Sequence, residues 1–133
     1  MAVIDASVAA AIILHLPWSA AARVAIAAEK RLLAPVVFPV EIANTIWRSV
    51  RAGQLVAGSA ANALSTACAI VEIRSDDRLI ESALQLALRH MHPVYDCLYL
   101  ALAKAEDTVL LTADRRLVSI ADAAAVSTKY FSA

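Results

Sequence analysis

Short apolar runs alternate along this chain with longer stretches in which apolar residues recur every three or four positions. The first pattern is typical of strands buried on both faces, and the second is typical of amphipathic helices. The predicted strands are Val3–Ile4, Leu32–Pro35, Ile70–Ile73, Val109–Thr112 and an edge strand at Val126–Tyr130. Strands that alternate with helices indicate an α/β fold, with a parallel sheet covered by helices on both faces.

Residues that favour helix ends bound several of the helical segments. Ser7 can cap the first helix and Pro17 ends it. Pro39 suits the first turn of a later helix, and Gly53 follows the last residue of that helix. The predicted helices are Ser7–Leu14, Ser19–Lys30, Pro39–Arg51, Ser59–Ala69, Asp76–His90, Tyr95–Ala105 and Arg115–Ala121, with a brief extended stretch at Val94.

Length and composition restrict the classes of protein that this chain can belong to. A chain of 133 residues without a linker or repeat predicts a single domain over residues 1–133. Its 12 basic and 12 acidic residues cancel, so RNA or membrane binding would need a local patch. Two glycines are too few for a glycine-rich dinucleotide loop or a Walker A loop. Cys68 and Cys97 are too few for a disulfide scaffold or a zinc ribbon.

Apolar segments of this chain do not match the patterns of membrane proteins or secreted proteins. The richest apolar run, Ala6–Leu14, is too short to cross a bilayer. No basic residue precedes it, and Asp5 interrupts the start of a possible signal peptide. We therefore expect a cytoplasmic protein that does not associate with membranes.

Two acidic residues follow predicted strands. Asp5 closes the first strand, and Asp114 follows the strand Val109–Thr112 with one residue between them. Ligands of open parallel sheets bind at the carboxyl ends of the strands, where both residues are expected. Each residue alone could equally be a helix cap or a turn former.

Two further acids lie in the first turns of predicted helices. Asp96 shares a helix face with Leu100 and Ala103, which should be buried. The helix N-terminus stabilises a negative charge by only about 0.3–1 kcal/mol, which does not explain why Asp96 has apolar neighbours. Glu41 shares a polar face with Asn44 and with Thr45, Arg48 and Arg51. A solvated helix face remains an equal explanation for the two arginines.

Four carboxylates at one edge of a sheet would need a counter-charge. Two of them about 4 Å apart repel by roughly 4 kcal/mol at an effective dielectric constant of 20. Either some are protonated or a divalent cation neutralises them, and oxygen ligands suit Mg²⁺ or Mn²⁺. We count no histidine among the expected ligands in these motifs, which disfavours zinc. We expect His15, His90 and His92 at surfaces or helix ends.

Hydroxyl groups stand beside two of the acids. Ser7 and Thr112 could hydrogen-bond the carboxylates of Asp5 and Asp114, although helix capping is the favoured role of Ser7. A magnesium site of this kind binds a scissile phosphate and lowers the pKa of a bound water. The residues therefore indicate phosphodiester hydrolysis.

The segments around the four acids resemble the motifs of a known family. They are AVIDASV around Asp5, FPVEIANTIWR around Glu41, HPVYDCLYLALA around Asp96 and LLTADRRL around Asp114. In these motifs, their order and their spacing, the chain resembles PIN-domain ribonucleases, and specifically the toxins of VapBC-type toxin–antitoxin pairs. The resemblance covers the chain from end to end.

This resemblance implies a fold, an activity and partners. The implied fold is a three-layer α/β/α domain with about five parallel strands. The implied activity is Mg²⁺- or Mn²⁺-dependent cleavage of cellular RNA such as tRNA or rRNA, in the cytoplasm of a prokaryote. The implied partners are a second copy of the chain and a cognate antitoxin whose tail covers the site.

The resemblance also assigns roles to residues. Asp5, Asp96 and Asp114 would be metal ligands, and Glu41 would support them or bind a second metal. Further residues would support this cluster or carry the RNA. The supporting residues are Ser7, Asn44 and Thr112, and the expected RNA-binding residues are Arg48, Arg51, Arg115 and Arg116.

Two other functions fit parts of the sequence. A PIN-like interaction module without catalytic activity would use the alanine-rich segment Ser19–Lys30 with Trp18 and Trp47 as an apolar patch. The complete set of acids argues against an inactive module. Another phosphoryl-transfer enzyme is disfavoured, because Ser7 stands where a phosphatase with a nucleophilic Asp5 would place a second aspartate.

Overall fold

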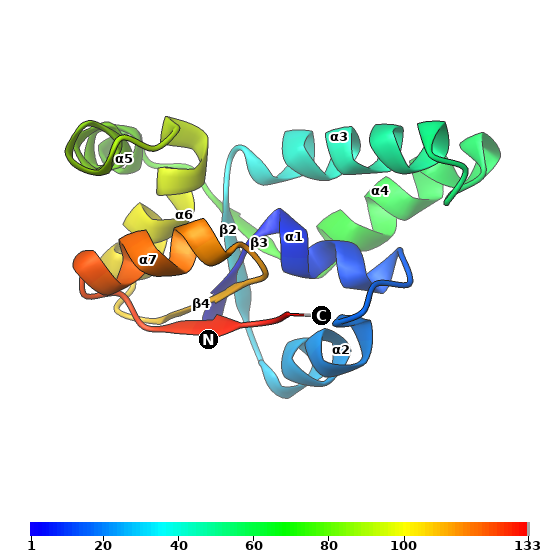
Figure 1. Ribbon diagram of the computed structural model, residues 1–133, viewed down its shortest axis with the longest axis horizontal. Helices are drawn as coiled ribbons and strands as arrows, with labels where there is room; N and C mark the ends of the chain where they lie inside the picture. The colour runs from blue at the N-terminus through cyan, green and yellow to red at the C-terminus, as the bar shows by residue number, and fades with distance from the viewer. Residues whose placement is uncertain (133) are drawn as a thin grey trace.

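The computed structural model describes residues 1–132, which fold around a five-stranded parallel sheet (Figure 1). The strands lie in the order β3-β2-β1-β4-β5. Their bounds are β1 Ala2–Ile4, β2 Leu32–Pro35, β3 Glu72–Arg74, β4 Val109–Thr112 and β5 Thr128–Tyr130. The predicted α/β class and the parallel sheet are confirmed.

The order of the strands reverses direction between β1 and β4. The chain runs from β1 outward through β2 to β3, and then returns to the other side of β1 to form β4 and β5. β1 and β4 pair with Ile4 opposite Leu111, and the backbone N–H of Asp5 donates to the Leu111 carbonyl at 3.1 Å. Ligands of open α/β sheets bind at the carboxyl ends of such a strand pair. The residues that follow β1 and β4 therefore border this crevice.

Helices cover both faces of the sheet. α6 packs on β1, β2 and β4 and is covered by α5, whereas α1 lies on the other side, as Figure 1 shows. α3 begins just after the carboxyl end of β2 and packs against α4. The helices are α1 Ala6–Ala9, η1 Ala10–Ile12, α2 Ser19–Ala28, α3 Phe38–Arg51, η2 Ala57–Ser59, α4 Ala60–Ala69, α5 Asp77–His90, α6 Val94–Ala105 and α7 Arg115–Ala123.

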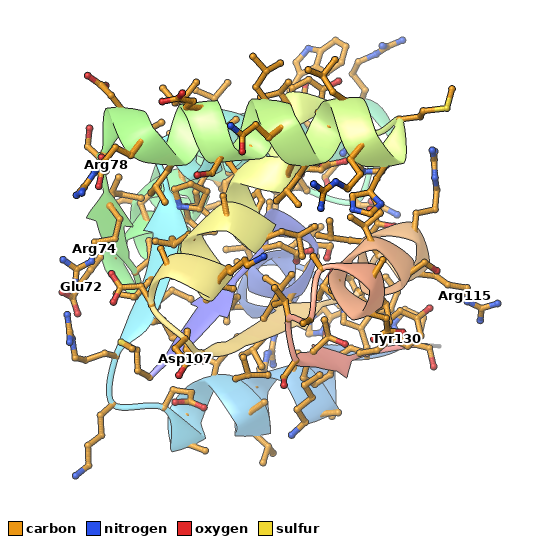
Figure 2. All side chains as sticks on the ribbon, turned by 90° about the vertical axis from the view of Figure 1, so that its left-hand side faces the viewer. Glu72, Arg74, Arg78, Asp107, Arg115 and Tyr130 are labelled. Carbon is orange, nitrogen blue, oxygen red and sulfur yellow. The ribbon has the colours of Figure 1, made fainter. Side chains whose placement is uncertain are left out.

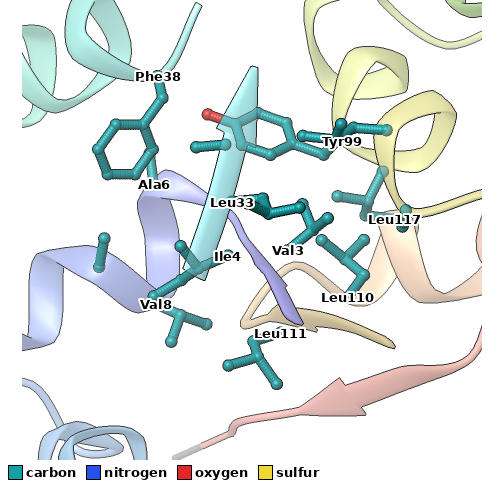
Figure 3. Packing of buried hydrophobic residues seen from close by; sticks show 14 of the residues in the cluster. Val3, Ile4, Ala6, Val8, Leu33, Phe38, Tyr99, Leu110, Leu111 and Leu117 are labelled. Carbon is teal, nitrogen blue, oxygen red and sulfur yellow. The ribbon is translucent and has the colours of Figure 1, made fainter. Parts of the chain in front are cut away.

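The core is formed by the central strands and the helices that cover them. Val3, Leu33 and Leu110, from three adjacent strands, are completely buried, and Phe38 and Tyr99 close the core near the carboxyl edge (Figure 3). Apolar side chains on both faces of β1, β2 and β4 explain why these strands are continuous apolar runs in the sequence.

Four local expectations were wrong. Asp5, and not Ser7, is the N-cap of α1, because its side chain accepts the Val8 N–H. α1 is a single turn followed by the 3₁₀ turn η1. Val94 is the first residue of α6 and is not extended, since Pro93 ends the extended link and needs no N–H partner there. β3 begins two residues later than expected, on the exposed edge of the sheet.

Cys68 and Cys97 are free thiols, half-buried and buried respectively. Among residues 1–132, no helix combines the length and the hydropathy that a membrane span requires.

Candidate active site

The four predicted acids lie at the carboxyl edge of the sheet, at the starts of four helices. Asp5 is the N-cap of α1, and Asp114 is the N-cap of α7. Glu41 lies in the first turn of α3, and Asp96 lies in the first turn of α6. The carboxylates influence one another: Asp114 raises the pKa of Asp5, and Asp96 and Asp5 raise that of Glu41. The structure therefore brings together all four acids.

Asp5 is buried, with 5% of its surface exposed. Its Oδ1 accepts hydrogen bonds from Ser7 Oγ at 2.5 Å and from the Val8 N–H at 3.1 Å. Its Oδ2 accepts a hydrogen bond from Thr112 Oγ1. Burial is the largest influence on this group and raises its pKa to about 6, although all three hydrogen bonds favour the charged form.

The two hydroxyls also join the two halves of the crevice. Ser7 Oγ accepts the Ala113 N–H at 3.0 Å, and Thr112 Oγ1 accepts the Asp114 N–H at 3.0 Å. Each hydroxyl thus donates to Asp5 and accepts from the segment that carries Asp114. Their predicted role in supporting the acidic cluster agrees with these contacts, and Ser7 acts here instead of capping a helix.

Glu41 has one bound and one unbound carboxylate oxygen. Tyr99 Oη donates to Oε2 at 3.3 Å, whereas Oε1 is buried and has no hydrogen-bond partner within residues 1–132. Burial first, and then the charges of Asp96 and Asp5, raise the pKa of Glu41 to about 7. Burial beside the same carboxylates also raises the pKa of Tyr99, so its phenol remains a hydrogen-bond donor.

Sequence reasoning missed His92. The residue was expected at a surface or a helix end, but it is 7% exposed, and its Nε2 lies 2.8 Å from Asp96 Oδ2. It occupies the link between α5 and α6, four residues before Asp96. The signal was the motif HPVYD, in which a histidine precedes an acid by one helical turn at a helix start. His15, by contrast, is exposed as expected.

The donor atoms of this site fit a divalent cation. Ligand atoms of His92, Asp96 and Asp114 lie within 4.8 Å of one another. Glu41 Oε1 adds a buried oxygen that has no hydrogen-bond partner in the described part of the chain. Within the described part of the chain, no lysine or arginine forms an ion pair with Asp5 or with the other three acids. A cation would therefore supply the missing counter-charge.

The other predicted site residues lie at different distances from this cluster. Asn44 is exposed, and within residues 1–132 its side chain has no hydrogen bond to the acids. Arg48 is exposed and lines a hollow of ≈ 340 Å³ together with Ser7 and Trp18. Its position beside Ser7 connects this hollow to the acidic cluster.

The remaining predicted arginines stack on aromatic rings or follow Asp114. Arg51 stacks on Trp47, with its guanidinium carbon 4.9 Å from the ring centre. Arg115 and Arg116 are exposed at the start of α7, directly after Asp114, and Figure 2 shows Arg115 beside Tyr130. Three of the four arginines thus flank the crevice or the hollow that opens from it, while Arg51 lies further along α3.

Comparison with known proteins places this geometry in a family. The model of the PIN domain family matches residues 2–123. Ribonuclease VapC3 of Pyrobaculum aerophilum is 33% identical over 118 residues, which cover 86% of this chain and 90% of that protein.

Solved structures share the fold. PAE2754 from Pyrobaculum aerophilum superposes with a TM-score of 0.71 at 24% identity, over 90% of this chain and 84% of that one. Mycobacterium tuberculosis VapC20, described as a sarcin-ricin loop cleaving toxin, superposes with a TM-score of 0.68 at 17% identity, over 90% of this chain and 94% of that one. The structure of VapBC2 from Rickettsia felis, bound to a DNA fragment from its promoter, superposes with a TM-score of 0.70 at 12% identity, over 98% of each chain.

The raised pKa values of Asp5 and Glu41 predict how stability depends on pH. Folding raises these values from 3.8 to about 6 and from 4.5 to about 7. A carboxyl group with a raised pKa favours the folded state fully below its unfolded value, and this contribution is lost as the pH rises through the folded value. The metal-free chain should therefore lose stability between about pH 4 and pH 7.

Glu41→Gln should reduce this loss, since an amide does not ionise. At about pH 8 the free energy of unfolding of the variant should exceed that of the wild type by about 1–2 kcal/mol, and at about pH 4 the two should be equal. The figure at pH 8 is reduced because part of the Glu41 side chain is exposed to solvent. Urea unfolding in EDTA at both pH values measures the difference. Glu81→Gln, which changes an exposed acid of α5, is the control and should match the wild type. If the stability of the wild type and of Glu41→Gln depended on pH in the same way, folding would not raise the pKa of Glu41.

Proposed function

The chain belongs to the PIN domain family, and from this premise we propose that it is a metal-dependent endoribonuclease, the toxin of a VapBC-type toxin–antitoxin pair. One observation carries the proposal: four carboxylates from distant segments meet where the strand order reverses, and within residues 1–132 no lysine or arginine is paired with them. The 33% identity to a ribonuclease that matches 86% of the chain supports the same reaction class.

Each acid has a distinct part in this reaction. Asp96 and Asp114, which lie in one group of ligand atoms, would bind the cation together with Asp5, which Ser7 and Thr112 hold in place. Magnesium or manganese, when bound, activates a water molecule and neutralises charge on the phosphodiester.

Glu41 is suited to proton transfer. In the metal-free site, burial and the charges of Asp96 and Asp5 raise its pKa to about 7, so this carboxyl group holds and releases a proton near physiological pH, as a general base must. Oε1 has no hydrogen-bond partner among residues 1–132 and is available to accept a proton, while Tyr99 donates to Oε2. Burial of Tyr99 keeps its phenol protonated, so this orientation persists across the neutral range.

The proposed substrate is structured cellular RNA, such as tRNA or rRNA. One structural neighbour is described as a sarcin-ricin loop cleaving toxin. Arg48 at the hollow beside Ser7, and Arg115 and Arg116 beside Asp114, would contact phosphates on both sides of the site. Such contacts position the RNA and make binding weaker at higher salt.

The proposed partners are an antitoxin and a second copy of the chain. Bidentate contacts from an arginine of the antitoxin tail would neutralise the same carboxylates and cover the site. On α5, Ile80, Leu84 and Leu88 are 49%, 47% and 74% exposed, and they recur at every fourth position on one face. An apolar stripe of this kind supports a dimer interface.

A PIN-like interaction module without activity is the second candidate function. Trp47 is 54% exposed and lines an apolar hollow of ≈ 320 Å³ between α3 and α4. A partner that fills this hollow is compatible with both the nuclease and the interaction module. The acidic cluster, however, has a role only in the nuclease.

Removal of single carboxylate charges should abolish cleavage. We expect purified chain to cut RNA from a panel of tRNAs and ribosomal RNA with Mg²⁺ or Mn²⁺ and not with EDTA. Asp5→Asn and Asp96→Asn should each lower the rate about 100-fold or more, because each removes a charge that holds the cation. Asp122→Asn changes an exposed acid of α7 and should cleave like the wild type.

Circular dichroism should show that these variants stay folded. Full activity of either variant in the acidic cluster would contradict the proposal. Absence of cleavage by folded, metal-loaded wild type on every RNA would favour the interaction module.

A charge in the apolar stripe of α5 should prevent dimer formation. Leu84→Glu should sediment as a monomer at concentrations where the wild type is a dimer, because a buried carboxylate without a partner is costly. Val24→Glu alters an apolar residue of α2 that is 72% exposed, more than Leu84, and should remain dimeric. A wild type that is monomeric at all concentrations would disprove the dimer.

A further inference from the structure

His92 lies in the acidic cluster, on a backbone that is fixed on both sides. Met91 adopts the left-handed conformation that ends α5, with φ 53°, and the His92 N–H donates to the Ala87 carbonyl at 3.2 Å. Pro93 follows as the N-cap of α6. The link between α5 and α6 thus holds His92 in a buried position. His92 is only 7% exposed, whereas the neighbouring Met91 is 89% exposed.

The ring nitrogen lies among the carboxylate oxygens that bind a cation in the proposed function. Nε2 is 2.8 Å from Asp96 Oδ2, and a ligand atom of His92 is within 4.8 Å of one of Asp114. Two adjacent ligand atoms of an octahedral ion, each about 2.1 Å from it, lie about 3 Å apart, and opposite ones lie about 4.2 Å apart. The 2.8 Å contact fits two adjacent ligands, and the 4.8 Å limit exceeds the distance between opposite ligands by at most about 0.6 Å, so small movements of these side chains would let them share one ion.

We propose that His92 is a ligand of the metal centre, and that its nitrogen makes the site select a first-row transition ion such as Mn²⁺ over Mg²⁺. The inference rests on the proposed function, to which it adds a ligand and the class of metal.

The chemistry of the donors supports this selectivity. Mg²⁺ is a hard ion that takes oxygen ligands and releases its waters reluctantly. Imidazole binds first-row transition ions, and affinity for a mixed nitrogen and oxygen site rises from Mn²⁺ towards the later members of the series. In a site made of one imidazole and the carboxylates of Asp96 and Asp114, all three groups bind Mn²⁺ well, whereas the imidazole binds Mg²⁺ weakly.

A positioning role is the competing explanation for the same contact. His92 would then only donate to Asp96 Oδ2 and orient that carboxylate. In that case its loss would weaken both metals to the same extent, because Asp96 serves both. A ligand role instead separates the two metals, and this difference can be measured without RNA.

The test uses the full, metal-free chain, titrated calorimetrically with Mn²⁺ alone and with Mg²⁺ alone. Wild type should bind Mn²⁺ at least about tenfold more tightly than Mg²⁺. His92→Gln keeps an N–H that can donate to Asp96 but has no imidazole. It should weaken Mn²⁺ binding about tenfold or more and change Mg²⁺ binding less than about twofold. His15→Gln, at an exposed histidine, is the matched control and should behave as wild type.

A second measurement has its main readout in the wild type, so its result does not depend on whether the variant folds. Electron spin echo modulation of the Mn²⁺-loaded wild type should show coupling to an imidazole ¹⁴N, and His92→Gln should lack it. Wild type without nitrogen coupling, or equal weakening of both metals in His92→Gln, would overturn the ligand role and leave the proposed nuclease intact. Failure of the wild type to bind either metal would instead contradict the metal dependence of the proposed function.

Discussion

The rest of this structure depends on holding four mutually repelling carboxylates together at one edge of a sheet. Asp5 and Glu41 show the cost directly, because burial and neighbouring charges raise their pKa values to about 6 and about 7. The chain offsets part of this cost with neutral donors. Ser7 and Thr112 donate to Asp5, and Tyr99 donates to Glu41. Such donors stabilise the negative charges without cancelling them, so the cluster keeps a strong attraction for a cation.

Strand order makes this arrangement possible. The chain leaves β1 in one direction and later returns to its other side, so Asp5 and Asp114 follow neighbouring strands although more than 100 residues separate them. Ser7 and Thr112 connect these two ends through bonds to Asp5 and to the backbone that precedes α7. A pair of hydroxyls thus fixes the spacing across the crevice, and the apolar strands beneath provide the rigid base.

Local pattern in the sequence predicted most of the fold and the acids of the site. Strand ends located Asp5 and Asp114, and an acid on an apolar helix face located Asp96. Sequence pattern did not reveal the hydrogen bond that Ser7 accepts from the backbone across the crevice, or the burial of His92. Ser7 looked like a helix cap, because nothing near it in sequence indicates the Ala113 N–H that it accepts. His92 looked like a helix-end residue, because its burial depends on how α5 and α6 pack together.

The central claim is that these carboxylates form one cation site at the junction of β1 and β4. Anomalous diffraction from crystals soaked in Mn²⁺ tests this claim most directly. The account predicts a single strong peak in contact with the carboxylates of Asp96 and Asp114 and close to Asp5. Strong peaks at surface acids only, with no density at this junction, would contradict it.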